Sequence, residues 1–256
     1  MKLAIMQPYF FPYIGYFQAI HAVDKYILYE NIDYIKEGWV HRNRILVKYR
    51  EPKYISVNIE TKSSNTKISE IKLCNNEIWK KKILHTIKYN YSGSAFFKEI
   101  YPLVEKIINQ DADYIHIFNS NCIMTICSYL DISTKIQYSN QHYLEMEKTL
   151  DEEYDKEEKD RLISTPYRNL EKKTARMLTI CEKEGADVFI NAIGGQNIYK
   201  KEVVKDYGID LFFIKTQEIS YPQFSHSFVP NLSIIDVLMH CGKEGTIDLL
   251  HKYTLI

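Results

Sequence analysis

The sequence predicts an α/β protein with a Rossmann-like parallel or mixed sheet flanked by helices. Two observations lead to this class. Strand-like apolar segments alternate with amphipathic helical segments near both ends of the chain, and the first such group has the length of an ordinary βαβ unit. With 256 residues, the chain is long enough to bury one substantial core. We therefore expect a single structural unit over residues 1–256, with a helical insertion in its middle.

The first unit begins at the amino terminus. Residues 3–6 have the pattern of a strand, residues 14–23 that of an amphipathic helix, and residues 25–29 that of the next strand. The turn after the first strand reads QPYFFPY and is rich in proline and aromatic residues rather than glycine. Ligands of parallel sheets bind at the carboxyl ends of strands, so we expect Gln7, Tyr9 and Tyr13 to contact a substrate.

The middle of the chain is predicted to be mainly helical. Residues 45–47, 54–59 and 68–73 have strand patterns, and the helical section that follows spans about 76–130. The segment at about 141–160 is highly charged, which favours a mobile loop; a solvated helix is the alternative.

The last third returns to alternating elements. A helix is predicted at 169–185, a strand at 187–191, a short helix at 199–207 and a strand at 211–214. Ser233 and Asp236 have the spacing of a capping box and open a final amphipathic helix that ends near residue 242.

Composition excludes several classes of protein. Lys plus Arg and Asp plus Glu both total 33, so no basic excess indicates a nucleic-acid partner. No apolar run is long enough for membrane insertion or a signal peptide, which predicts a cytoplasmic protein. The five cysteines and eight histidines lack the spacings of disulfide frameworks or metal sites, so we expect no metal. The 21 tyrosines suit a pocket for sugars or nucleobases, although an AT-rich genome would also favour them.

Three stretches carry a resemblance to a known family. They are MQPYFFPYIGYF at 6–17, the segment 33–45 with Asp33-Tyr34-Ile35-Lys36, Gly38-Trp39 and Arg42-Asn43-Arg44-Ile45, and FVPNLSIID at 228–236. The chain resembles the WbqC-like protein family. Members typically sit among genes for O-antigen, capsule or flagellar glycan assembly, so the resemblance implies a transferase of cell-surface glycan, including lipopolysaccharide, biosynthesis. It implies transfer of a glycyl or related acyl group to the amine of a nucleotide-linked 4-amino-4,6-dideoxy sugar.

Such an N-acyltransferase needs no tightly bound cofactor. Its partners would be the nucleotide-linked amino sugar and an acyl donor carried as a thioester on a coenzyme or on an acyl or aminoacyl carrier protein. The reaction requires a base for the amine and donors for the developing oxyanion. Our catalytic candidates are His21, Asp33 and Asn43.

The segment from 33 to 44 concentrates further binding groups. Arg42 and Arg44 alternate around Asn43, so both side chains lie on one side of an extended segment and can bind a diphosphate together. A basic surface turn is the alternative interpretation. The remaining candidates for substrate binding are Tyr34, Lys36, Trp39, Gln196, Asn197 and Gln223.

Two other functions stay open. Nucleotidyltransferases that begin with a strand, turn and helix carry a His-x-Gly-His turn, where this chain has Tyr13-Ile14-Gly15-Tyr16. Tyrosine cannot supply the cationic imidazolium, which argues against adenylyl transfer but leaves ATP-dependent activation as an alternative. The other alternative is a non-catalytic scaffold of the glycan pathway.

Overall fold

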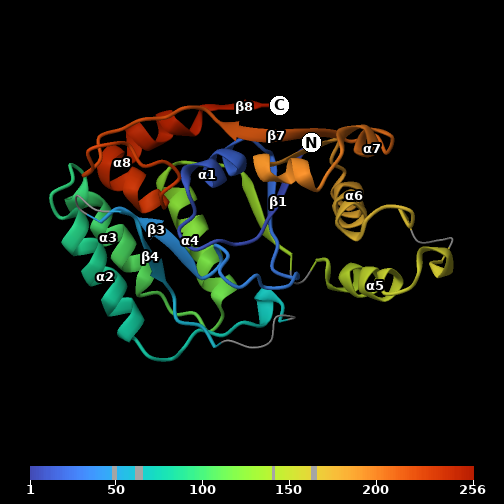
Figure 1. Cartoon of the computed structure of the whole chain (residues 1–256), viewed down its shortest axis with the longest axis horizontal. Coiled ribbons are helices and arrows are strands. Elements are labelled where there is room, and N and C mark those ends of the chain that lie inside the picture. The colour runs from blue at the N-terminus through green and yellow to red at the C-terminus, as the bar shows by residue number, and fades with distance from the viewer. Residues whose placement is uncertain (48–50, 61–65, 140–141, 163–165) are drawn as a thin grey trace.

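The computed structural model describes residues 1–47, 51–60, 66–139, 142–162 and 166–256. Within these ranges, six strands form one mixed sheet in the order β5-β2-β1-β6-β7-β8, in which only β8 runs antiparallel to its neighbour (Figure 1). The predicted α/β, Rossmann-like class is therefore confirmed. The strands are β1 (Lys2–Met6), β2 (Lys25–Leu28), β5 (Lys135–Tyr138), β6 (Val188–Ala192), β7 (Asp210–Thr216) and β8 (Tyr253–Leu255).

Helices cover both faces of the sheet because successive strand residues point to opposite sides. Leu3 and Ile27 pack against α5, α6 and α7, whereas Ala4 and Leu28 pack against α1, α4 and α8 (Figure 1). None of the described helices has the length and apolar character needed to cross a bilayer. The helices are α1 (Ile14–His21), α2 (Ile78–Tyr91), α3 (Phe97–Ile108), α4 (Ile115–Tyr129), α5 (Leu144–Tyr154), α6 (Lys172–Glu184), α7 (Lys201–Lys205) and α8 (Ile234–Leu250).

Strand order reverses direction at β1. β1 pairs with β2 on one side and with β6 on the other, and the chain reaches these two neighbours through separate crossovers. In doubly wound sheets, this reversal of strand order leaves an opening between the loops at the carboxyl ends of the two central strands. The β1–α1 loop (residues 7–13) and the 3-10 turn η3 (Ile193–Asn197) flank that point.

The middle of the chain agrees in part with the sequence prediction. Helices α2, α3 and α4 lie in the predicted helical section, and α5 occupies most of the charged segment, so the helical alternative is the one formed there. Residues 68–73 were predicted as a strand and instead form the 3-10 turn η1 (Ile68–Glu70) followed by an isolated bridge at Leu73. Their apolar side chains are buried in the main hydrophobic core, where η1 contacts α4, rather than by pairing in a sheet. A separate antiparallel ribbon consists of β3 (Arg42–Ile45) and β4 (Lys53–Ser56).

Helix α8 contains a sharp kink. Gly242 has φ 64° and ψ −165°, a conformation that side chains disfavour. A Cβ atom at this position would lie 2.5 Å from the ring of Phe96. The kink therefore lets the loop before α3 pack closely against α8.

Candidate functional site at the carboxyl edge of the sheet

The β1–α1 loop is held by hydrogen bonds to its backbone carbonyls. Asn43 Nδ2 donates to the carbonyl oxygens of Phe10 and Phe11 at 3.0 and 2.8 Å. Asn119 Nδ2 donates to Pro8 O at 2.9 Å, and Ser233 Oγ donates to Phe11 O at 2.9 Å. Three segments that are far apart in the sequence thus fix one loop, and its backbone is shaped before any ligand arrives.

One residue of this loop has a strained backbone. Phe11 has φ 40°, which is unusual for a residue with a side chain. Its ring is fully buried, and its carbonyl oxygen accepts hydrogen bonds from both Asn43 and Ser233. Such strain persists where surrounding contacts over-determine the conformation, which is common at functional sites.

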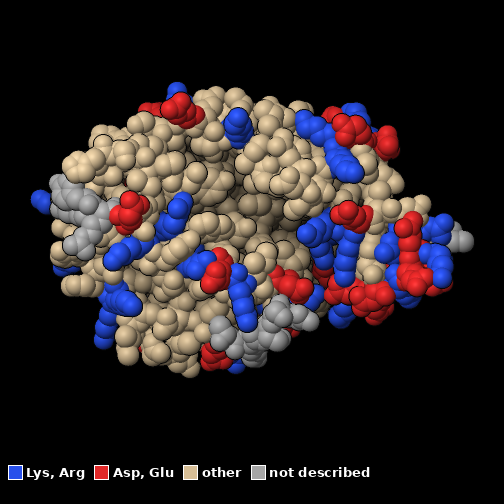
Figure 2. Space-filling view, in the orientation of Figure 1, with Lys and Arg blue, Asp and Glu red and all other residues tan. Residues whose placement is uncertain are grey.

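Two tyrosines of the loop offer hydroxyl groups. Tyr9 and Tyr13 are half-buried, and burial raises the pKa of both phenols. The neighbouring Tyr13 raises the pKa of Tyr9 further. Both therefore remain protonated hydrogen-bond donors near neutral pH. A Cβ atom at Gly15 would lie 2.4 Å from the Tyr13 ring, so this glycine lets the ring lie against the start of α1. Figure 2 shows that the molecular surface is hollowed near β1 and α1 and is bordered there mostly by uncharged residues.

The ribbon separates Asn43 from its neighbouring arginines. Asn43 points at the β1–α1 loop, so alternation sends the side chains of Arg42 and Arg44 to the outer face. There the Arg42 guanidinium lies 4.4 Å from the ring centroid of Tyr54, and that of Arg44 lies 5.9 Å from Trp39. These four residues form a cation–aromatic cluster in which Trp39 and Tyr54 are exposed and the two arginines are partly buried.

The other candidates of the segment 33–44 lie outside the loop. Tyr34 is buried, and its hydroxyl is 2.6 Å from Nδ1 of His41. Burial lowers the pKa of His41, with a further contribution from Arg42, so this imidazole favours its neutral form. Asp33 and Lys36 are exposed.

His21 and the later candidates fall in different places. His21 is the last residue of α1, about 10 Å along the axis from Ile14, and its ring contacts that of His251. Gln196 and Asn197 are exposed in η3, at the same edge of the sheet as the β1–α1 loop. Gln223 Nε2 donates to Asp236 Oδ2 at 2.8 Å and so ties the preceding loop to α8.

The capping box predicted at α8 forms only in part. Ser233 Oγ accepts a hydrogen bond from Ile235 N at 3.3 Å, as an N-cap should. The Asp236 carboxylate is fully buried and accepts instead from the hydroxyls of Tyr91 and Tyr221, at 2.7 and 2.8 Å. Burial raises the pKa of both tyrosines, and the neighbouring Asp236 carboxylate raises it further.

His116 is a candidate that the sequence reasoning missed. It lies in the first turn of α4, one turn before Asn119, which donates to the β1–α1 loop. The side chain is 7% exposed, and its Nδ1 has no hydrogen-bond partner among the described residues. Burial lowers its pKa to about 4, so the imidazole is neutral near pH 7. The sequence could have indicated His116 by its position, because it lies at the start of a helix that leads into a strand. The starts of such helices lie at the carboxyl edge of a parallel sheet.

Comparisons with known proteins identify the family of the chain. The model of the WbqC-like protein family matches residues 7–247, which include the β1–α1 loop, the ribbon and most of α8. The chain belongs to the WbqC-like protein family. It is also 28% identical over 247 residues to Uncharacterized protein Rv1507c of Mycobacterium tuberculosis, with 95% of each chain covered. No solved structure matches this WbqC-like chain.

Proposed function

We propose that this WbqC-like protein is an N-acyltransferase of cell-surface glycan biosynthesis. It would transfer a glycyl or related acyl group to the amine of a nucleotide-linked 4-amino-4,6-dideoxy sugar. The observation that carries the proposal is the preformed β1–α1 loop at the point where strand order reverses, because doubly wound sheets bind nucleotide ligands there. The choice of reaction rests on the glycan association implied by the family.

The β1–α1 loop supplies the proposed contacts to the nucleotide-linked sugar. The hydroxyls of Tyr9 and Tyr13 are protonated donors for phosphate or sugar oxygens, and Gln7 can both donate and accept. Gln196 and Asn197 extend these contacts from the opposite side of the crevice. Because the carbonyls of the loop are already held, little backbone ordering would be needed on binding.

The chemical step is attack of the sugar amine on the carbonyl carbon of a thioester. A new C–N bond forms, the C–S bond breaks, and the thiol leaves as the amine loses its proton. We propose His116 as the group that accepts this proton, because it is neutral, has an unpartnered Nδ1 and lies one turn from a residue that contacts the loop. His21 is a weaker candidate because it lies at the far end of α1.

The cation–aromatic cluster suits the acyl donor better than the sugar. Arg42 and Arg44 lie on the outer face of the ribbon, so we propose that they meet an acidic surface of a carrier protein that bears the thioester. ATP-dependent activation is less well supported, because the Tyr16 hydroxyl already donates to Gln7 O at 2.9 Å.

Titration with nucleotide-linked sugars tests the proposal. Purified protein should bind one nucleotide-linked amino sugar selectively in calorimetry with UDP-, GDP-, CMP- and dTDP-linked sugars. Tyr9→Phe and Tyr13→Phe should each weaken that binding several-fold, whereas Tyr89→Phe, an exposed control on α2, should not. Formation of an amide product from a supplied acyl thioester would then identify the reaction. If no nucleotide-linked sugar binds while ATP does, the activating function replaces this proposal.

A further inference from the structure

A second site lies beside the carboxyl end of β2. A cavity of about 430 Å³ opens there between the segment after β2, the turn η1 and helix α5. Its wall includes Asn31, Lys67, Glu147, Lys148 and Asp151. Nothing in the proposed acyl transfer requires this cavity.

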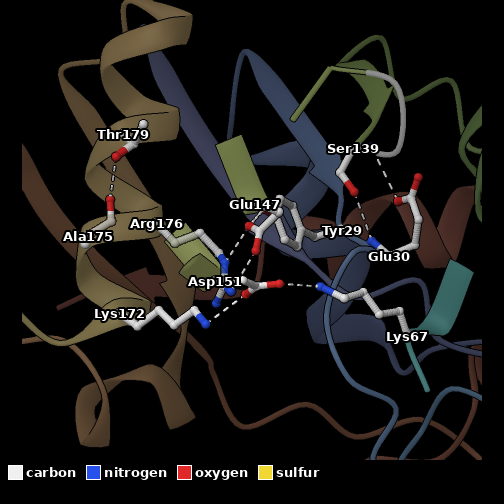
Figure 3. Close-up of polar contacts among 10 residues, drawn as sticks. All are labelled: Tyr29, Glu30, Lys67, Ser139, Glu147, Asp151, Lys172, Ala175, Arg176 and Thr179. Atoms are coloured by element: carbon white, nitrogen blue, oxygen red, sulfur yellow. Dashed lines mark hydrogen bonds and ion pairs between the residues drawn. The ribbon is translucent and has the colours of Figure 1, made fainter. Parts of the chain in front are cut away.

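One wall of the cavity is an ordered ionic network (Figure 3). Glu147 is 1% exposed and accepts from Nε and Nη2 of Arg176 at 2.6 and 2.8 Å, and from the hydroxyl of Tyr29. Asp151 lies between Lys67 Nζ at 3.0 Å and Lys172 Nζ at 2.8 Å, and the two ammonium groups lower the pKa of Asp151 against the opposing effect of burial. The carboxylates of Glu147 and Asp151 are therefore already engaged by cations of the protein, whereas Glu70, exposed at the rim, accepts from the backbone N–H of Lys67 at 3.2 Å.

Asn31 is the group that this network leaves unused. The residue is 2% exposed, and its side-chain Nδ2 has no hydrogen-bond partner among the described residues. A buried amide nitrogen is only a donor, and buried donors in folded proteins are almost always paired. The missing partner must therefore offer an acceptor atom.

The cations of the cavity point to the same kind of ligand. Lys67 donates to Asp151, and Lys148 pairs with the exposed Glu145 at 2.8 Å. An ammonium group has three N–H donors, so both lysines keep donors for a further partner. Spare N–H donors beside two carboxylates that are already paired, Glu147 and Asp151, favour a ligand rich in acceptor oxygens.

We propose that this cavity binds a small molecule through an oxyanion, either a carboxylate or a phosphate, held by Asn31 Nδ2 and Lys67 Nζ. The ionic network fixes Lys67, whose ammonium group then faces the ligand together with the buried amide. Lys148 contributes charge from the open side. Glu147 and Arg176 act as a rigid support rather than as ligand contacts.

Titration with simple oxyanions tests the site. Inorganic phosphate and acetate are added separately to the full-length protein at constant ionic strength, because charge screening would otherwise change with the titrant. The side-chain amide signal of Asn31 is followed by NMR and assigned by its loss in Asn31→Asp. We expect saturable movement of this signal with one of the two anions, and the anion that acts identifies the chemical class.

Variants distinguish a built site from general attraction to a basic surface. Asn31→Asp keeps the shape but replaces the amide donors with a carboxylate, and it should weaken binding at least tenfold. Lys67→Met should do the same by an independent route if Asn31→Asp fails to fold. Asn75→Asp makes the same charge change at an exposed position and should leave the affinity unchanged. Absence of saturation by both anions in the wild type, or equal affinity in Asn31→Asp, Lys67→Met and the control, overturns the proposal.

Discussion

Replacing Asn43 with alanine should destabilise the whole protein rather than remove a catalytic group. Among the described residues, Asn43 is the only donor to Phe10 O, so the substitution leaves that carbonyl unpaired. It also removes the acceptor of Arg44 N, which lies 2.8 Å from Asn43 Oδ1. Each buried polar group left without a partner costs about 1–3 kcal/mol, so we expect a loss of about 3 kcal/mol. Phe11 O keeps its hydrogen bond from Ser233. In a chain of this size, such a loss lowers Tm by roughly 6–12 °C.

Thermal and urea unfolding of matched variants measure this effect. Asn43→Asp keeps the volume and the acceptor but turns a carboxylate oxygen toward two carbonyl oxygens, so it should be at least as damaging at pH 7. Asn75→Ala, at an exposed position, should change the free energy of unfolding by less than about 0.5 kcal/mol. A Tm of Asn43→Ala within about 2 °C of wild type would refute the supporting role given to Asn43. If activity were lost at an unchanged Tm, the residue would be catalytic, as the sequence suggested.

Three further predictions concern other parts of the molecule. Burial lowers the pKa of His116 to about 4 from an ordinary value near 6.5. Between these two pH values, the His116 imidazole is protonated in the unfolded chain and neutral in the folded chain. The free energy of unfolding, measured by urea titration, should therefore fall as the pH drops from 7 toward 4.5. In His116→Gln, this free energy should fall less steeply with pH. Gly242→Ala should lower Tm because the new Cβ atom would lie 2.5 Å from the ring of Phe96. Adding Phe96→Ala should restore only part of the lost Tm, since the positive φ at residue 242 remains. In steady-state assays, the double variant Arg42→Ala, Arg44→Ala should raise KM for a carrier-borne acyl donor at least tenfold and leave KM for the nucleotide-linked sugar unchanged. If KM for the sugar rises instead, the arginines bind the diphosphate of the sugar nucleotide rather than the carrier.

The elements that sequence reasoning identified are those whose burial is periodic. The first βαβ unit, predicted at 3–6, 14–23 and 25–29, forms as β1, α1 and β2 with small changes at the ends. The strands β5 and β8 were missed because they are short and lie at or near the sheet edges, where polar residues such as Lys135 and Thr254 are tolerated. Residues 68–73 were wrongly predicted as a strand because their β-branched residues are buried without belonging to a sheet.

The position of the candidate loop in the fold could be predicted from the sequence, but the contacts of its residues could not. The strand and turn that end at Gln7 indicated the carboxyl edge of the sheet, and alternation correctly separated Asn43 from its flanking arginines. The loop carbonyls to which Asn43 donates belong to residues more than 30 positions away, and no local pattern carries that information. His116 and Asn31 were missed because their significance comes from burial without a partner, which only the packed structure reveals.

The hydrogen bonds that hold the β1–α1 loop come from distant parts of the chain, so the loop can be fixed only late in synthesis. Phe11 leaves the ribosome early, whereas Ser233, which donates to its carbonyl, is 222 residues further along the chain. At ordinary elongation rates, this separation corresponds to roughly 10–40 s of translation. Throughout that interval, the growing chain carries the tyrosines of the loop without one of the groups that fix them. Any binding that needs this loop in its folded form should therefore arise only in nearly finished chains.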